Sequence, residues 1–187
     1  MPRPNWFLAF PLDGTFVQGL PELPSALRLF HPEDVHLTLA FLGGCGEDGA
    51  MRALAALDAR LAIDPPPATH VTLGDVVPMG GSRKTYSALS ALLGTGREAL
   101  TATLTSHRDA LTEAANNRRE SRPAKPHITI ARPRRRATPE DRDAGLEWAE
   151  SLDLSHVEAR LDRIALFTWS EPRNERLFRI VAERRLR

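Results

Sequence analysis

The segments His36-Leu37-Thr38-Leu39 and His127-Ile128-Thr129-Ile130 repeat one pattern, in which a histidine and a threonine stand two residues apart and alternate with apolar residues. Successive side chains of a β-strand point to opposite faces, so His36 shares a face with Thr38. The opposite face of the same strand is expected to carry Leu37, Leu39 and Phe41. The repeated pattern therefore predicts two strands that each bury one face and present an imidazole and a hydroxyl on the other.

The two segments are 91 positions apart, from His36 to His127, which is about half the length of the 187-residue chain. A hydrophobic content of 42% is ordinary for a globular protein of this length. We expect residues 1–187 to form a single domain with two pseudo-symmetric lobes, each of which contributes one motif strand to a shared cleft. The sequence shows no apolar run long enough to span a bilayer and no secretory signal, so we expect a cytoplasmic protein with no membrane partner.

Other motifs that would bring a cofactor are missing from the sequence. Cys45 is the single cysteine, and there is no His-Glu-x-x-His segment or acidic cluster with the spacing of metal ligands. Gly94-Thr95-Gly96 is not followed by the Gly-Lys-Ser/Thr of a phosphate loop. We therefore expect chemistry without a metal ion, a nucleoside triphosphate or another cofactor.

Positive charge is concentrated around the second motif. Residues 118–136 carry a local net charge of +7, from eight basic residues and the single acid Glu120. The basic residues are Arg118, Arg119, Arg122, Lys125, Arg132, Arg134, Arg135 and Arg136. Such a block attracts anionic ligands. The charge alone favours a solvated basic surface, but its location around His127 makes the two interpretations about equally good.

Strand and helix patterns alternate along the chain. Periodicity predicts strands at 5–10, 35–42, 71–73, 86–92, at the segment that carries His127, and at 163–169 and 177–182. Helices are predicted at 47–61, at 95–115 and after Thr138, which stands at the N-cap position before Pro139. The short turn at 78–81 favours hairpins, so the pattern indicates a mixed or antiparallel sheet and not a purely parallel one.

Two histidines on neighbouring strands suit the cleavage of a phosphodiester. One imidazole accepts a proton from the attacking oxygen and the other donates a proton to the departing oxygen, because an ordinary histidine pKa near 6.5 allows both forms near neutral pH. Thr38 and Thr129 would donate hydrogen bonds to the nonbridging phosphate oxygens. Arg132 follows the second motif, and its guanidinium can hold a phosphate through paired donors.

Strict alternation places Arg132 on the wrong face. Counting by twos from Thr129 brings Ala131 to the site face and Arg132 to the core face, where an unpaired charge is costly. Because Pro133 follows, we expect the strand to end there and the arginine to turn toward the rim of the cleft. The remaining histidines lack the motif context and are expected to have structural roles; they are His31, His70, His107 and His156.

At these residues the sequence resembles the 2H phosphoesterase superfamily, named for two His-x-Thr-x motifs, and within it the RNA 2′,3′-cyclic phosphodiesterases, also called 2′-5′ RNA ligases. The first block of that family resembles residues 36–43, and the second resembles 122–132. Weaker similarity extends to residues 6–9, 83–86 and 166–170, so the resemblance covers most of the chain.

The resemblance implies a bilobal α+β fold with two antiparallel sheets around a central cleft and helices on the outer faces. It implies metal-independent hydrolysis of RNA 2′,3′-cyclic phosphate ends to 2′-phosphates, with His36 as general acid and His127 as general base. It also implies reversible 2′-5′ joining of RNA ends without ATP, tRNA halves as partners, and RNA contacts from Phe7, Tyr86 and Lys125. We expect a monomer. Tyr86 stands where the family usually has tryptophan, and Phe178 where it often has tyrosine.

Two alternatives remain open at the level of sequence. A noncatalytic RNA- or nucleotide-binding module would use the same cleft and arginines for affinity alone, and its binding would survive loss of the histidines. An enzyme whose main task is the ligation of tRNA halves would be distinguished by its product, a strand joined through a 2′-5′ linkage.

Overall fold

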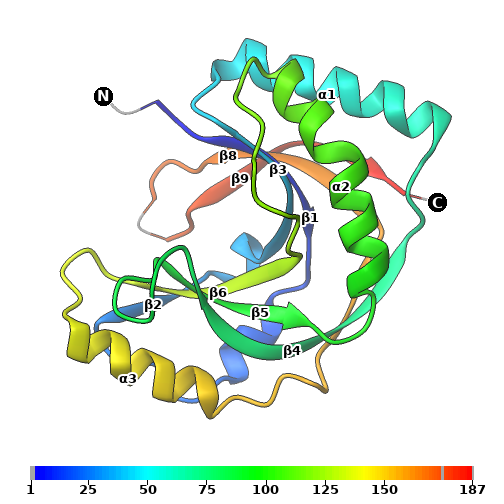
Figure 1. The fold of residues 1–187 in the computed structure, drawn as a ribbon. Coiled ribbons are helices and arrows are strands. Elements are labelled where there is room, and N and C mark those ends of the chain that lie inside the picture. The colour runs from blue at the N-terminus through cyan, green and yellow to red at the C-terminus, as the bar shows by residue number, and fades with distance from the viewer. Residues whose placement is uncertain (1–2, 174, 187) are drawn as a thin grey trace.

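The part of the chain that the structure describes folds into a curled antiparallel β-sheet with three α-helices on its outer side (Figure 1). The computed structural model describes residues 3–173 and 175–186. Its helices are α1 (Gly46–Ile63), α2 (Arg97–Ala114) and α3 (Pro139–Glu150). Its strands are β1 (Trp6–Pro11), β2 (Leu27–Leu29), β3 (His36–Gly43), β4 (Thr69–Met79), β5 (Ala88–Leu93), β6 (His127–Pro133), β7 (Glu158–Leu161), β8 (Arg163–Trp169) and β9 (Phe178–Arg185).

The sheet runs in the order β7-β4-β5-β6-β3-β1-β8-β9, with β2 paired to β6, and every pairing is antiparallel. The expected α+β fold is confirmed. The two predicted sheets are continuous, because β3 and β6 pair with each other through Leu37 and Ile128. Helices α1 and α2 pack against β1 and β3, whereas α3 packs against β4 and β6 (Figure 1).

Both motif strands contain a register shift immediately after the threonine. In β3, Ala40 pairs with Leu8 and Thr38 with Ala9, which leaves Leu39 as an extra residue. In β6, Ala131 pairs with Leu89 and Thr129 with Ser90, which leaves Ile130 as an extra residue. An extra residue of this kind is a β-bulge, and it exchanges the two faces for everything that follows along the strand.

The bulge in β3 overturns one expectation of the alternation. Phe41 does not share the core face with Leu37 and Leu39, which are buried, because its side chain is 54% exposed. It pairs directly with Phe7 and so lies on the face that carries Thr38. The two residues that directly follow the threonine, Leu39 and Ala40, are both buried, as the bulge requires.

Most predicted elements are present with shifted ends. The strand predicted at 163–169 has those bounds, and the strand at 71–73 is the middle of the longer β4. Strands β2 and β7 were not predicted, because neither is long enough to show a period. Two short 3₁₀ helices, Thr15–Gly19 and Pro32–Asp34, also lie outside the predicted elements.

The structural role expected for His107 is confirmed. Its ring lies buried between α1 and α2, and Arg60 Nε donates a hydrogen bond to its Nδ1 at 2.9 Å. Burial and the charge of Arg60 lower the pKa of His107, so the neutral ring is favoured. Among the described residues, none of the helices combines the length and the hydrophobicity that a bilayer-spanning segment needs.

Helix α3 begins at the predicted N-cap. The Thr138 hydroxyl accepts a hydrogen bond from the Asp141 backbone N–H, and the Asp141 carboxylate accepts one from the Thr138 N–H, which completes a capping box. Tyr86 contacts this helix as well, because its hydroxyl donates to the Arg142 carbonyl at 3.0 Å. Helix α3 is therefore attached to the rest of the protein by the Tyr86 hydrogen bond near its N-terminus as well as by its apolar face.

We expect Thr138→Ala to lower the free energy of unfolding by about 1 kcal/mol, because the Asp141 N–H loses its partner at the helix start. In a protein of this size that loss lowers the melting temperature by roughly 2–4 °C. Thr138→Ser keeps the hydroxyl and serves as the control. Equal melting temperatures for the two variants would show that the capping box does not stabilise α3.

Candidate active site

The two motifs lie side by side on adjacent strands. Because Leu37 and Ile128 are direct partners in an antiparallel pair, continuation of the register places His36 opposite Thr129 and Thr38 opposite His127. Leu37 and Ile128 are fully buried on one face, whereas the histidines and threonines are half-buried on the other. Directly opposite side chains stand about 5 Å apart in such a pair, so the four groups form one compact constellation.

The two imidazoles are held in the same way. His36 Nδ1 lies 2.6 Å from the Asp34 carbonyl oxygen, and His127 Nδ1 lies 2.7 Å from the Lys125 carbonyl oxygen. A carbonyl oxygen only accepts, so each Nδ1 carries the proton and donates it. The neutral rings therefore keep the lone pair on Nε2, the nitrogen that is left to exchange a proton with a ligand.

Aromatic side chains enclose His36. Its ring stacks on Phe7 at a centroid separation of 4.7 Å, lies 5.4 Å from Phe167, and meets the edge of Phe178 at 5.6 Å. Burial among these rings, together with the charges of Arg132 and His127, lowers the pKa of His36 from 6.5 to about 4, and the hydrogen bond to Asp34 opposes this shift. In the free protein His36 is neutral at physiological pH.

The carboxylate of Asp34 fixes one wall of this enclosure. Asp34 is fully buried, and its carboxylate accepts hydrogen bonds from the backbone N–H groups of Leu177 at 2.6 Å and Phe178 at 2.9 Å. The same residue accepts the His36 Nδ1 proton through its carbonyl. Asp34 therefore joins the start of β9, and with it the Phe178 ring, to the segment that orients His36. Sequence reasoning missed this role, because an aspartate two residues before a histidine is not distinctive.

Ser90 is a second residue that the sequence did not reveal. It is fully buried on β5 opposite Thr129, and the two hydroxyl oxygens lie 3.1 Å apart. The hydrogen bond orients the Thr129 hydroxyl. Ala9 occupies the corresponding position opposite Thr38, so the first motif has no such partner there. Only the pairing register shows this contact, since no local pattern distinguishes Ser90 from other serines.

The second bulge resolves the position of Arg132. Ile130 and Ala131 are both buried, and the face exchange brings Arg132 back to the side of His127 and Thr129 while β6 still continues to Pro133. We expected Arg132 to reach the cleft because the strand ends at Pro133. The arginine does lie on the expected side, but the bulge places it there and not the strand end. Its guanidinium carbon lies 5.1 Å above the centre of the Phe30 ring. Surrounding protein, and then the charge of Arg173, lower the pKa of Arg132.

The three RNA contacts implied by the resemblance lie in different settings. Tyr86 is fully buried beneath α3, so it has no surface to offer an RNA base, and we correct that expectation. Phe7 is 3% exposed and packs against His36, which makes it a support for the imidazole and not an RNA contact. Lys125 is exposed beside His127 and keeps its candidate role.

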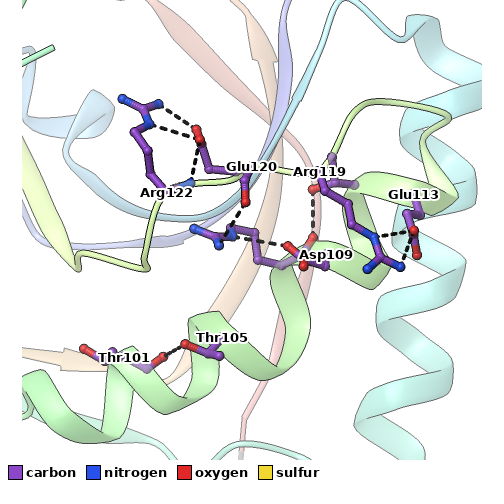
Figure 2. Close-up of polar contacts among 9 residues, drawn as sticks. Thr101, Thr105, Asp109, Glu113, Arg119, Glu120 and Arg122 are labelled. Carbon is purple, nitrogen blue, oxygen red and sulfur yellow. Dashed lines mark hydrogen bonds and ion pairs between the residues drawn. The ribbon is translucent and has the colours of Figure 1, made fainter.

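Part of the basic segment is neutralised locally. Figure 2 shows Arg122 turned toward the Glu120 carboxylate and Arg119 turned toward Glu113. The distance from Arg122 Nη2 to the Glu120 carboxylate is 2.6 Å. The charge count over 118–136 omitted Glu113, which precedes that range. The guanidinium of Arg134 donates to the Ser25 carbonyl. Of the basic residues in this segment, Arg132 is the one whose charge acts on His36.

Potential metal ligands do not cluster in the described part of the chain, where no three His, Cys, Asp or Glu side chains are grouped as a metal ion would need. The His36 and His127 rings direct their Nδ1 atoms at carbonyl oxygens and lie opposite hydroxyls. This arrangement is suited to proton transfer at a bound anion.

No family model matches the sequence, and no curated protein sequence matches it. The fold does match solved structures along the whole chain. E. coli LigT complexed with 3′-AMP has a TM-score of 0.71 and 18% identity, over 98% of this chain and 99% of that chain. LigT complexed with NADP⁺ has a TM-score of 0.66 and 19% identity, over 100% and 99%. TT0787 of Thermus thermophilus has a TM-score of 0.62 and 18% identity, over 98% of both chains. The protein has a LigT-like fold.

We expect the His36 imidazole to titrate with a midpoint of about 4 in the free protein. In the unfolded chain the pKa of His36 is 6.5, so the unfolded chain binds more protons than the folded protein between pH 4 and pH 6.5. The contribution of the neutral His36 to the free energy of unfolding is therefore complete above pH 6.5 and is lost as the pH falls toward 4. NMR of the histidine rings measures the midpoint. Arg132→Gln should raise it, because a positive charge is removed. A midpoint near 6.5 would contradict the enclosure described for His36.

Proposed function

We propose that the protein is a 2H phosphoesterase that hydrolyses RNA 2′,3′-cyclic phosphate ends to 2′-phosphates. The observation that carries this proposal is the constellation on β3 and β6, where two imidazoles with fixed Nδ1 protons and two threonine hydroxyls occupy one face. The LigT-like fold supports it, and LigT itself has been crystallised with 3′-AMP, ATP and NADP⁺. The pairing and the bulge shared by the motif strands also support a single domain of two pseudo-symmetric lobes.

The histidines divide the proton transfers between them. His127 Nε2 removes a proton from water, whose oxygen attacks phosphorus, while the protonated His36 gives its Nε2 proton to O3′ as the P–O3′ bond breaks. The product is a 2′-phosphate with a free 3′-hydroxyl. At the end His127 holds the proton taken from water and His36 is neutral, so proton exchange with solvent restores the starting state.

Binding of the substrate prepares His36 for this role. The free imidazole is neutral at physiological pH because of its burial and the nearby positive charges. An anionic phosphate beside Arg132 offsets that guanidinium, which raises the pKa of His36 and favours its protonated form. Thr38 and Thr129 donate to the nonbridging oxygens, and Arg132 offsets the charge that builds up in the transition state. His36 is thereby protonated when the phosphate is bound.

The same residues support joining of RNA ends. When a 5′-hydroxyl replaces water as the nucleophile, His127 removes its proton, the P–O3′ bond breaks as before, and the product is a 2′-5′ linkage. Opening the cyclic phosphate requires no ATP, and tRNA halves carry ends of this type. Lys125, exposed beside His127, is placed to contact the incoming strand.

We expect the purified protein, in the presence of a chelator, to convert cytidine 2′,3′-cyclic phosphate to the 2′-phosphate. His36→Ala and His127→Ala should each lower kcat by roughly 10²–10⁴-fold, because each removes one proton transfer. His70→Ala is the matched control, since His70 is exposed on β4 away from the motif strands. Phosphorus NMR identifies the product.

Each alternative outcome has a definite meaning. Release of the 3′-phosphate would show that O2′ departs and would reverse the leaving group assigned to His36. Salt-sensitive binding without turnover, retained in both histidine variants, would identify a noncatalytic binding module.

Ser90→Ala should lower kcat by roughly fivefold to tenfold, because the Thr129 hydroxyl loses the hydrogen bond that orients it. Steady-state kinetics with the same substrate provides the measurement. Ser87→Ala is the control, since this exposed hydroxyl contacts the Met79 carbonyl in the turn before β5. Similar kinetics for wild type and Ser90→Ala would mean that Thr129 does not depend on Ser90.

A further inference from the structure

Two arginines near the active site rest on aromatic rings. The guanidinium carbon of Arg132 lies 5.1 Å from the centre of the Phe30 ring, and that of Arg173 lies 4.1 Å from the centre of the Trp169 ring. A guanidinium over a ring face is held by cation–π attraction, which does not use up its N–H donors. Stacking therefore orders both side chains without consuming their hydrogen bonds.

The two stacked pairs belong to one region of the site face. Trp169 at the end of β8 pairs with Phe178, whose ring lies 6.4 Å from Phe30 and 5.6 Å from His36. Phe167 shares the site face with Phe7, so Trp169, two residues further along β8, is on that face as well. The charge of Arg173 contributes to the lowered pKa of Arg132, as expected for neighbouring guanidiniums.

Arg132 and Arg173 differ from other arginines nearby in their ion pairing. Within residues 3–173 and 175–186, no carboxylate forms an ion pair with Arg132 or Arg173. This contrasts with Arg119, Arg122 and Arg176, each of which is paired with an acid. Like charges held close together without a counter-ion favour an anionic ligand, and planar guanidiniums suit a phosphate.

We propose that Arg173, ordered by Trp169, binds a second phosphate of the substrate, the phosphodiester on the 5′ side of the nucleotide that carries the cyclic phosphate. This inference rests on the proposed function. The acid His36 stands on the side of O3′, and O3′ stays attached to the nucleoside. The nucleoside and its 5′ phosphodiester therefore lie toward His36, the region of Trp169 and Arg173, while Arg132 serves the reacting phosphate. The site selects an RNA end over a free nucleotide.

Two substrates that differ by one phosphodiester test this proposal. They are cytidine 2′,3′-cyclic phosphate and a dinucleotide that ends in the same cyclic phosphate. Arg173→Gln should lower kcat/KM for the dinucleotide roughly tenfold to a hundredfold more than for the mononucleotide, as expected for a lost charged hydrogen bond. Arg97→Gln, an exposed arginine at the start of the outer helix α2, should change neither value. An equal loss on both substrates, or no loss, would overturn the assignment.

The charge of the internal linkage gives a second measurement. For the wild type, a dinucleotide with an uncharged methylphosphonate linkage should lose the advantage over the mononucleotide, and Arg173→Gln should cause no additional loss with it. Trp169→Leu keeps the Arg173 guanidinium but removes the ring that orders it. This variant should therefore weaken the preference for the charged dinucleotide by a smaller factor than Arg173→Gln. An advantage that persists with the methylphosphonate would show that the second base, and not the phosphate, is bound.

A binding measurement separates failure of this inference from failure of the proposed function. Cytidine 2′-phosphate and the dinucleotide ending in a 2′-phosphate are titrated into wild type and Arg173→Gln at several salt concentrations. The wild type should prefer the dinucleotide, and the variant should lose that preference with a salt slope smaller by about 1. If neither cyclic substrate is hydrolysed, the proposed function is wrong. The titration still shows in that case whether Arg173 binds a second phosphate. Equal affinities in the wild type would overturn the second site.

Discussion

The backbone pairing of Leu37 with Ile128 is the contact on which the rest of the structure depends. It is the place where β3 meets β6, so it joins the β7-β4-β5-β6 half of the sheet to the β3-β1-β8-β9 half. Both side chains are completely buried, which fixes the register, since a slip of one residue would turn apolar groups to solvent. The same pairing brings each histidine opposite the threonine of the other motif. Fold and site thus share one constraint.

The sequence is informative where periodicity is strong. The paired His-x-Thr segments, the long helices and the N-cap at Thr138 follow from local patterns, and the structure has them. Contacts between strands are different, because they depend on register. The partnership of Ser90 with Thr129, the burial of Tyr86 under α3 and the attachment of Asp34 to Phe178 join residues distant in the chain. Strict alternation of side chains along a strand also cannot reveal a bulge, and for this reason it wrongly predicts that Phe41 lies in the core.

The two histidines are alike in sequence and unlike in surroundings. Each donates Nδ1 to the carbonyl two residues earlier, so their orientation is set in the same way. His36 also lies among Phe7, Phe167 and Phe178, whereas no ring in the described part of the chain stacks on His127. A pair of titratable groups in different environments can divide the roles of acid and base, because their proton affinities respond differently to a bound anion. The repeated motif supplies the groups, and the asymmetric packing differentiates them.

The paired bulges make the local backbone geometry of the motif strands a functional property of this protein. The extra residue after each threonine decides which face Phe41 and Arg132 occupy. The two residues at each bulge, Leu39-Ala40 and Ile130-Ala131, are both buried. Substitutions at these buried positions change volume but preserve the arrangement of faces. A strand of the same length without the bulge would follow simple alternation and send the guanidinium of Arg132 toward the interior. The side on which Arg132 lies therefore depends on the bulge and not on its distance from Thr129 alone. If one of the two intervening residues were lost together with the bulge, alternation by itself would return the arginine to the face of Thr129.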